Sequence, residues 1–282
     1  MKNLKPYNGS AYSEYTDSVN RKNNSIEKRR LQSIKPFVKT SYEDYKSKFD
    51  ENTLYLMKRD SVFNSSKDIL LSLYDFQNRT IRNIRENIKN QQIITIQTTC
   101  QNCTIDSVES MDHVLPKTTF PELAINAYNL FPCCSRCNGY KSKLESSAGD
   151  KKFLNLFLDQ LPEIQYLFVS IFKSYDGSLD YKYYLQNIDE KIDPSLFTTI
   201  QNHFQNLHLF DRMRDSARTY LSAFIASIKP HLKRNSINYI KKTTLENIND
   251  ERKAYGFNYW KCSLEFALIQ SDIFWEYVES TK

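Results

Sequence analysis

Four cysteines in two pairs are the residues of this chain whose spacing predicts a metal site. Cys100 and Cys103 form one Cys-x-x-Cys pair, and Cys134 and Cys137 form a second pair, with 30 residues between the two. A Cys-x-x-Cys turn directs two thiolates at one tetrahedral ion about 2.3 Å away, and a second such turn closes the site. The sequence therefore predicts a structural zinc ion (Zn2+) holding a small segment that has little core of its own.

Two further cysteines have no partner at a metal-ligand spacing. Cys133 is adjacent to Cys134 and offers an alternative ligand, but Cys134 restores the two-residue gap to Cys137. We therefore expect Cys133 and Cys262 to be small buried side chains. Three histidines also lack a metal-ligand spacing and are expected to be ordinary helix residues: His203, His208 and His231.

Between and beside the cysteine pairs lie side chains suited to phosphodiester hydrolysis. Asp112 and His113 are adjacent, and Asn138 directly follows Cys137. Hydrolysis needs a base for the attacking water and a hard cation for the developing charge. A histidine supplies the base near neutral pH, and carboxylate and amide oxygens suit Mg2+. Taken singly these residues indicate a surface pair and a helix cap, but together in a zinc-held segment they favour a catalytic site.

Two strings within this segment carry a family resemblance. They are Asp-His-Val-Leu-Pro-Lys at 112–117 and Asn-Leu-Phe-Pro-Cys-Cys-Ser-Arg-Cys-Asn-Gly-Tyr-Lys at 129–141. The strings resemble the four-cysteine branch of the HNH (ββα-metal) endonucleases. Within that branch they are especially similar to the recombination endonuclease VII arrangement, in which an Asn follows the last zinc cysteine. The resemblance covers only about residues 100–143, so both flanks lie outside it.

The resemblance implies a role for each matching residue. His113 would be the general base, Asp112 and Asn138 would be ligands of a catalytic divalent metal, and Asn129 would brace the loop that bears the histidine. It also implies a β-hairpin and a helix starting near Ser135 around that metal, and products with 5′-phosphate and 3′-hydroxyl ends. Because the last position is Asn rather than His, hard Mg2+ or Mn2+ is the expected catalytic ion.

The first cysteine pair departs from the family at one position. Relatives often have Gly after the second cysteine, where this chain has Thr104. Glycine there allows a left-handed backbone turn. We therefore expect Thr104 to strain the first zinc turn.

Basic residues around the motif are the expected contacts to the phosphate backbone of DNA, double-stranded DNA above all. Such contacts give affinity and register but little sequence information. The net charge of +6 permits a nucleic-acid partner without requiring one, because nucleic-acid binding depends on whether the positive charges are clustered on the surface. The basic stretch 21–35 is interpreted either as a solvated helix face or as a further phosphate-contacting patch. The expected contacts near the motif are Lys117, Arg136, Lys141 and Lys143.

The wider pattern at 112–122 and 129–134 also resembles bacterial HNH proteins found beside ATPases in anti-phage defence, such as Septu-type systems. That resemblance implies a regulatory ATPase as partner, docked by the helical flanks. Three alternatives remain open: a free-standing nuclease, a zinc-knuckle module that binds DNA or protein without catalysis, and an RNA-cleaving HNH nuclease. Retention of Asp112, His113 and Asn138 favours catalysis.

The fold that positions these residues is expected to be mainly α. A small α+β insertion is expected to form the zinc-stabilised ββα-metal core, flanked by helical regions. Scarce glycine and many Leu, Ile, Lys and Asn residues favour helices. We divide the chain into a helical N-terminal region with a basic arm at 1–95, a nuclease core at 96–146 and a helical C-terminal region at 147–282. The polar stretch 1–20 is expected to be a loosely packed arm.

Apolar periodicity predicts the longer helices. They are expected over 66–88, over 194–228 with Pro230 ending or kinking the chain, and over 258–278. The apolar run 93–96 predicts a short strand instead.

The chain is expected to be a cytoplasmic, soluble protein without a membrane partner. Residues 1–15 are polar and contain no apolar segment of the signal-peptide type. The apolar run 166–172 is too short to span a bilayer. In a reducing compartment, closely spaced cysteines bind metal more often than they form disulfides. The oligomeric state is left open.

Overall fold

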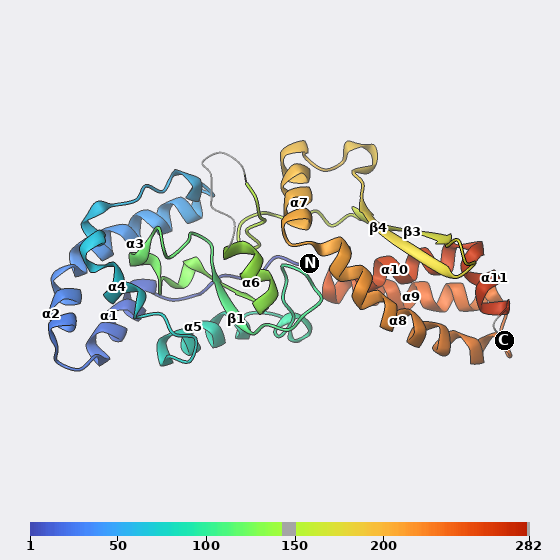
Figure 1. Ribbon diagram of the computed structural model, residues 1–282, viewed down its shortest axis with the longest axis horizontal. Coiled ribbons are helices and arrows are strands. Elements are labelled where there is room, and N and C mark those ends of the chain that lie inside the picture. Colours follow the sequence, from blue (N-terminus) through green and yellow to red (C-terminus); the bar gives the residue numbers. More distant parts are fainter. Residues whose placement is uncertain (143–150, 281–282) are drawn as a thin grey trace.

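The computed structural model describes residues 1–142 and 151–280 and is mainly helical, with two small two-stranded sheets. The molecule is elongated: the N-terminal and central elements lie towards one end, most of the elements after residue 166 lie towards the other, and the N-terminus lies between them (Figure 1). Buried apolar side chains form one continuous cluster through both ends. The expected boundary between residues 146 and 147 lies outside the described residues.

Capped helices build the N-terminal region. The side chains of Ser10, Ser25 and Asn78 accept hydrogen bonds from first-turn N–H groups, which would otherwise lack a partner. Short 3-10 turns connect some of the helices, η1 (Leu54–Leu56) and η2 (Ser61–Ser66). The helices are α1 (Ala11–Arg21), α2 (Ile26–Ser33), α3 (Lys35–Asp50), α4 (Lys67–Leu71) and α5 (Arg79–Asn90).

The expectation of a loosely packed N-terminal arm is wrong. Tyr15 and Val19 on α1 are completely buried, because this helix has one apolar face that packs into the core. Ahead of it, the backbone N–H of Leu4 donates to the carbonyl oxygen of Leu156 over 3.0 Å. The first residues are therefore part of the packed structure.

Several cations of the basic stretch 21–35 bind neighbouring parts of the chain. The Lys28 ammonium donates to the carbonyl oxygen of Asn20 over 2.7 Å. The Arg30 guanidinium donates through Nε to Ser66 Oγ over 3.1 Å. These contacts tie the helices of this region together, and they favour a structural role over an open phosphate-contacting patch.

The single helix predicted over 66–88 is divided into α4 and α5. Between them, the side chains of Asp75 and Asn78 accept hydrogen bonds from the backbone N–H groups two residues ahead, each over 2.9 Å. Short polar side chains compete with the helical backbone in this way. The predicted apolar positions still face the core, including Leu70, Leu73, Ile81, Ile84 and Ile88.

The central segment contains the first sheet and the helix that follows it. Strands β1 (Ser110–His113) and β2 (Leu130–Cys133) pair antiparallel, with His113 opposite Leu130, and α6 (Ser135–Ser142) follows almost directly. The strand predicted over 93–96 is wrong: these residues form a 3-10 turn, η3 (Ile94–Ile96), in which Ile94 is exposed. Two further turns connect β1 to β2, η4 (Pro121–Leu123) and η5 (Ala127–Asn129).

The C-terminal region was expected to be wholly helical, which is wrong at its start. Strands β3 (Leu167–Lys173) and β4 (Leu179–Leu185) form an antiparallel hairpin. Its loop contains Gly177 at φ +80°, a conformation that glycine adopts without steric cost. The turn η6 (Ile188–Glu190) follows.

Helices pack beneath the hairpin, with α10 (Trp260–Gln270) against β3 and α8 (Leu209–Leu232) against β4 (Figure 1). The helix predicted over 194–228 is broken at His208, whose φ of +51° is left-handed. Pro230 lies in the last turn of α8. The predicted helix over 258–278 is likewise divided at Ser271. The remaining helices are α7 (Pro194–Asn206), α9 (Ile237–Tyr255) and α11 (Asp272–Ser280).

Membrane insertion by a helix finds no support in the described part of the chain. Within residues 1–142 and 151–280, every helix is too short or too polar to cross a bilayer.

Candidate metal and catalytic site

The two predicted cysteine pairs come together as one buried cluster. The sulfur atoms of Cys100, Cys103, Cys134 and Cys137 all lie within 4.8 Å of one another. The distance between the Cys103 and Cys134 sulfurs is 3.9 Å. Four ligands at about 2.3 Å around a tetrahedral zinc ion stand about 3.8 Å apart, so the cluster fits zinc. The cluster contains Cys134 and not Cys133, in keeping with the two-residue gap to Cys137.

Backbone N–H groups support the sulfurs in both cysteine turns. The N–H of Ile105 points to the Cys103 sulfur and that of Cys137 to the Cys134 sulfur, each over 3.4 Å. Thr104 stands at φ +58°, which confirms a left-handed position where glycine is the unstrained residue. Its Oγ1 donates to the carbonyl oxygen of Cys103 over 2.7 Å, which helps to hold this conformation.

The two cysteines outside the cluster are both buried, as expected. Cys133 ends β2 with its sulfur 3.3 Å from Ser110 Oγ. Burial raises the pKa of the Cys133 thiol to about 12, which keeps it protonated. Cys262 lies on α10 and points to α9, with its sulfur 3.4 Å from Glu251 Oε2. Neither thiol belongs to the metal cluster.

His113 ends β1 with its ring held by a backbone carbonyl. The distance from Nε2 to the carbonyl oxygen of Ala124 is 2.9 Å. A carbonyl only accepts, so Nε2 carries the proton and Nδ1 is the basic nitrogen. Burial lowers the pKa of His113 to about 4, so the ring is neutral at physiological pH.

Asn129 connects the end of β1 to the turns before β2. Its Oδ1 accepts from the backbone N–H of Leu115 over 2.7 Å, and its Nδ2 donates to the Leu115 carbonyl over 3.0 Å. Nδ2 also donates to Leu123 over 3.3 Å, and the Tyr45 hydroxyl donates to Oδ1 over 3.2 Å. The side chain is completely buried. It therefore ties down the loop that follows His113.

Asp112 and Lys141 form an ion pair between β1 and α6. The distance from Lys141 Nζ to Asp112 Oδ2 is 2.5 Å, and the two side chains are 13% and 7% exposed. Burial lowers the pKa of Lys141, but the charge and hydrogen bond of Asp112, together with Cys133 and Cys137, raise it, and the resulting pKa lies above its usual value. Lys141 thus lies inside the segment rather than on an open DNA-facing surface.

Asn138 lies on α6 and faces β1. Its Nδ2 donates to Ser110 Oγ over 3.3 Å, which leaves its carbonyl oxygen as the atom suited to a cation. Asp112 and Asn138 thus stand on facing elements, β1 and α6, which pack together. A carboxylate and an amide oxygen are donors that Mg2+ and Mn2+ accept.

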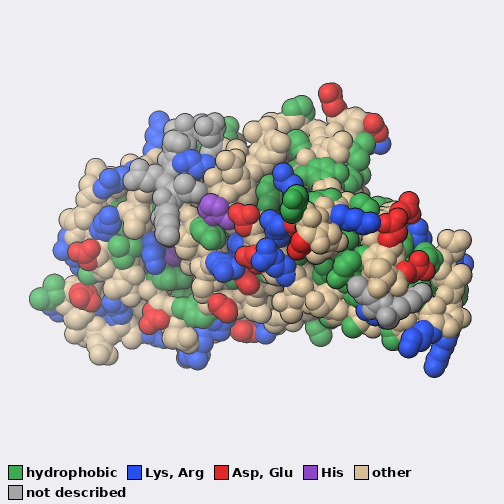
Figure 2. Space-filling model, turned by 45° about the vertical axis from the view of Figure 1, so that its right-hand side comes forward, with side chains coloured by type: hydrophobic (Ala, Val, Ile, Leu, Met, Phe, Trp, Pro, Cys, Tyr) green, Lys and Arg blue, Asp and Glu red, His purple; other side chains and the backbone are tan. Residues whose placement is uncertain are grey.

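The predicted phosphate contacts are placed differently from one another. Lys117 lies with Nζ 4.1 Å from the centre of the Tyr74 ring, half-buried beside the histidine. Arg136 on α6 is exposed, and Lys143 lies outside the described residues. On the face shown in Figure 2, the described Lys and Arg side chains are interspersed with Asp and Glu and form no continuous basic field.

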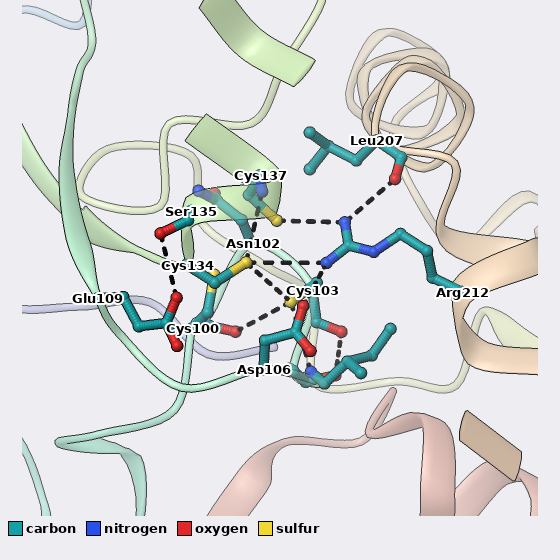
Figure 3. A network of polar contacts seen from close by, with 12 residues as sticks. Cys100, Asn102, Cys103, Asp106, Glu109, Cys134, Ser135, Cys137, Leu207 and Arg212 are labelled. Carbon is teal, nitrogen blue, oxygen red and sulfur yellow. Dashed lines mark hydrogen bonds and ion pairs between the residues drawn. The ribbon is translucent and has the colours of Figure 1, made fainter. Parts of the chain in front are cut away.

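Sequence reasoning did not assign Tyr74 or Arg212 to this site. The Tyr74 ring packs against the His113 ring at 4.6 Å between centres, and its hydroxyl donates to the Met111 carbonyl over 2.9 Å. Arg212 on α8 donates through one terminal nitrogen to the Cys137 sulfur over 3.3 Å (Figure 3). Both come from the flanks, and no local spacing in the sequence connects them to the motif.

Comparison with known proteins found a short stretch of similarity. The chain is 50% identical over 36 residues to "Septu protein PtuB" of Bacillus thuringiensis, a match that spans 13% of this chain and 14% of that protein. No family model matches the chain. No solved structure matches it either.

Proposed function

We propose that this protein is a metal-dependent endonuclease of the HNH type that hydrolyses DNA phosphodiester bonds. The observation that carries the proposal is the state of His113, neutral and fixed by the Ala124 carbonyl with Nδ1 as its basic nitrogen. A general base needs a defined orientation and a lone pair available at neutral pH. The structural histidine His203 has the same kind of Nε2 contact to a carbonyl, but its Nδ1 is used to accept from the Leu154 N–H.

Each neighbouring residue has a defined part in the proposal. His113 takes the proton from the attacking water at Nδ1 while its Nε2–H stays with the Ala124 carbonyl. Asn129 and the Tyr74 ring keep the imidazole in place. A Mg2+ or Mn2+ ion held by Asp112 and Asn138 would supply stabilisation of the developing negative charge.

The proposed biological setting is a Septu-type anti-phage system. The short match to a Septu protein supports it, together with the sequence pattern at 112–122 and 129–134. In that setting, we expect a regulatory ATPase to bind the flanking regions, which lie outside the motif.

Plasmid cleavage with Mg2+ or Mn2+ tests the proposal. His113→Ala should lower the rate by about 100-fold or more, because positioned acid–base groups contribute about 10²–10⁴-fold. His231→Ala is the matched control, since His231 is exposed on α8, and EDTA should abolish cleavage. Cleavage by His113→Ala at the wild-type rate would rule out this residue as the base. Matched DNA and RNA substrates separate the two nuclease alternatives.

The Asp112–Lys141 ion pair favours one competing function, a zinc-knuckle binding module without catalysis. Lys141 already neutralises the carboxylate that the catalytic ion would need. Calorimetric titration with Mn2+ distinguishes the two functions. A nuclease should bind Mn2+ in a way that Asp112→Asn weakens, whereas a binding module should retain DNA affinity without any Mn2+ site.

A further inference from the structure

The first zinc turn is enclosed by the rest of the chain. Residues 100–104 are each at most 3% exposed. A structural zinc site needs only to hold its own short segment together. The complete burial of this turn therefore points to a second role, as a surface onto which other elements pack.

Two helices of the C-terminal region donate hydrogen bonds to the backbone of this turn. His203 on α7 donates through Nε2 to the Asn102 carbonyl over 2.8 Å, while its Nδ1 accepts from the Leu154 N–H over 3.2 Å. Trp260 on α10 donates through Nε1 to the Thr104 carbonyl over 3.0 Å. Both side chains are buried, so each bond is shielded from water.

A third helix contributes a cation. Arg212 on α8 is 5% exposed and extends from α8 towards the sulfur cluster (Figure 3). Its terminal nitrogens lie 3.3 Å from the Cys137 sulfur and 3.7 Å from the Cys134 sulfur. One of them also lies 2.9 Å from Asp106 Oδ2. The guanidinium therefore faces two candidate zinc ligands and one carboxylate.

Charge explains why a cation is buried there. Zinc gathers four thiolates into a compact site with a net charge of about −2. Burying a guanidinium is costly unless it is paired and hydrogen-bonded. Arg212 and the zinc thiolates thus offset each other, and the geometry of α8 places this counter-charge at the joint between the two ends of the molecule.

We propose that the zinc turn at 100–104 is the joint on which α7, α8 and α10 dock, with Arg212 as counter-ion of the zinc thiolates. Zinc loading then sets how firmly the C-terminal helices are attached to the central segment. This inference does not depend on nuclease activity. Other contacts to the C-terminal region do not involve the zinc turn, such as that of the Met1 nitrogen with the Tyr255 carbonyl over 3.3 Å, so we expect local loosening after zinc removal.

Tryptophan fluorescence measures the docking directly, since the chain has two tryptophans. Trp260 contacts the zinc turn, whereas Trp275 donates to the Ile269 carbonyl within the C-terminal region. In Trp275→Phe, removing zinc with a chelator should increase acrylamide quenching of Trp260 several-fold. In Trp260→Phe, the same treatment should leave quenching of Trp275 unchanged. Hydrogen exchange of the unsubstituted protein should show increased exchange in α7 and the start of α8.

The role of Arg212 is tested by zinc affinity in competition with a chromogenic chelator. Arg212→Met should weaken zinc binding about 10- to 100-fold, the usual effect of removing a group that supports metal ligands. Arg212→Lys should recover part of that loss, because it restores the charge without the planar fork. Arg214→Met is the matched control, since Arg214 lies on the same helix but is 44% exposed and pairs with Asp180.

Three results would overturn the proposal. Trp260 would stay protected after zinc removal, or Trp260 and Trp275 would become accessible together, which indicates global unfolding. Alternatively, Arg212→Met would bind zinc as tightly as Arg214→Met. None of these readouts involves cleavage, so failure of the joint and failure of the nuclease are distinguishable.

Discussion

Asn129 is the buried side chain whose replacement has the most definite cost. Asn129→Asp keeps the size of the side chain but replaces its two N–H donors by an acceptor. The carbonyl oxygens of Leu115 and Leu123 then lose their donors, at 3.0 and 3.3 Å, and face another oxygen. Each buried polar group without a partner costs about 1–3 kcal/mol, so the free energy of unfolding should fall by about 2–6 kcal/mol.

Urea unfolding with saturating zinc, followed by circular dichroism, measures this change. Asn83→Asp is the control, because Asn83 is exposed on α5 and surface substitutions stay within about 0.5 kcal/mol. Tyr45→Phe removes only the hydroxyl group that bonds to Asn129 Oδ1 and should cost about 0.5–1.5 kcal/mol. A result for Asn129→Asp indistinguishable from Asn83→Asp would refute the argument that this side chain braces the loop.

Two further substitutions test the charges around the site. Burial lowers the pKa of His203 to about 3, whereas an unfolded histidine titrates near 6.5. The unfolded chain therefore binds the proton first, and the free energy of unfolding should fall as pH drops from about 6.5 towards 3; urea titrations of His203→Gln, with one donor and one acceptor, should show a smaller fall. Lys141→Met leaves the Asp112 carboxylate buried without its ammonium partner and should lower the free energy of unfolding by about 3–5 kcal/mol. Millimolar Mn2+ should restore part of that stability if Asp112 binds metal, and no recovery would count against this ligand.

The cysteine cluster could be predicted from the sequence because its ligands come in local pairs. The two-residue gap of a Cys-x-x-Cys turn selects Cys134 over Cys133 without any tertiary information. The left-handed conformation of Thr104 was likewise predictable, since it follows from the same turn. Local geometry determines both features.

The support that Arg212 gives to the cluster could not be predicted in this way. Arg212 lies 75 residues from Cys137 along the chain. The sequence around it on α8 does not distinguish it from other arginines in helices. The hairpin of β3 and β4 is a different case, because its signal was present. Asp176-Gly177 lies between two runs rich in aromatic and β-branched residues, which is a strong hairpin pattern. The prediction of a helical C-terminal region overlooked this pattern.

The prediction of helix boundaries was wrong where a single residue leaves the helical conformation. The apolar spacing of residues 194–228 continues through His208, so periodicity alone predicts one helix. His208 instead adopts φ +51°, and α8 starts afresh with a new direction (Figure 1). Its ring packs against Tyr140 of α6 at 4.8 Å between centres. A tertiary contact to the central segment therefore accompanies a break that local propensity does not indicate.

The two halves of the candidate site take their supports from opposite flanks. The histidine half is held by Tyr45 and Tyr74 of the N-terminal region, and the zinc half by Arg212 and Trp260 of the C-terminal region. The family resemblance covers neither flank. Each of these contacts requires only a hydrogen-bond donor or an aromatic ring at one position next to the site, and many different sequences can supply it. It follows that residues 100–143 expressed alone would keep the ligand spacing but lose the groups that orient the base and neutralise the thiolates.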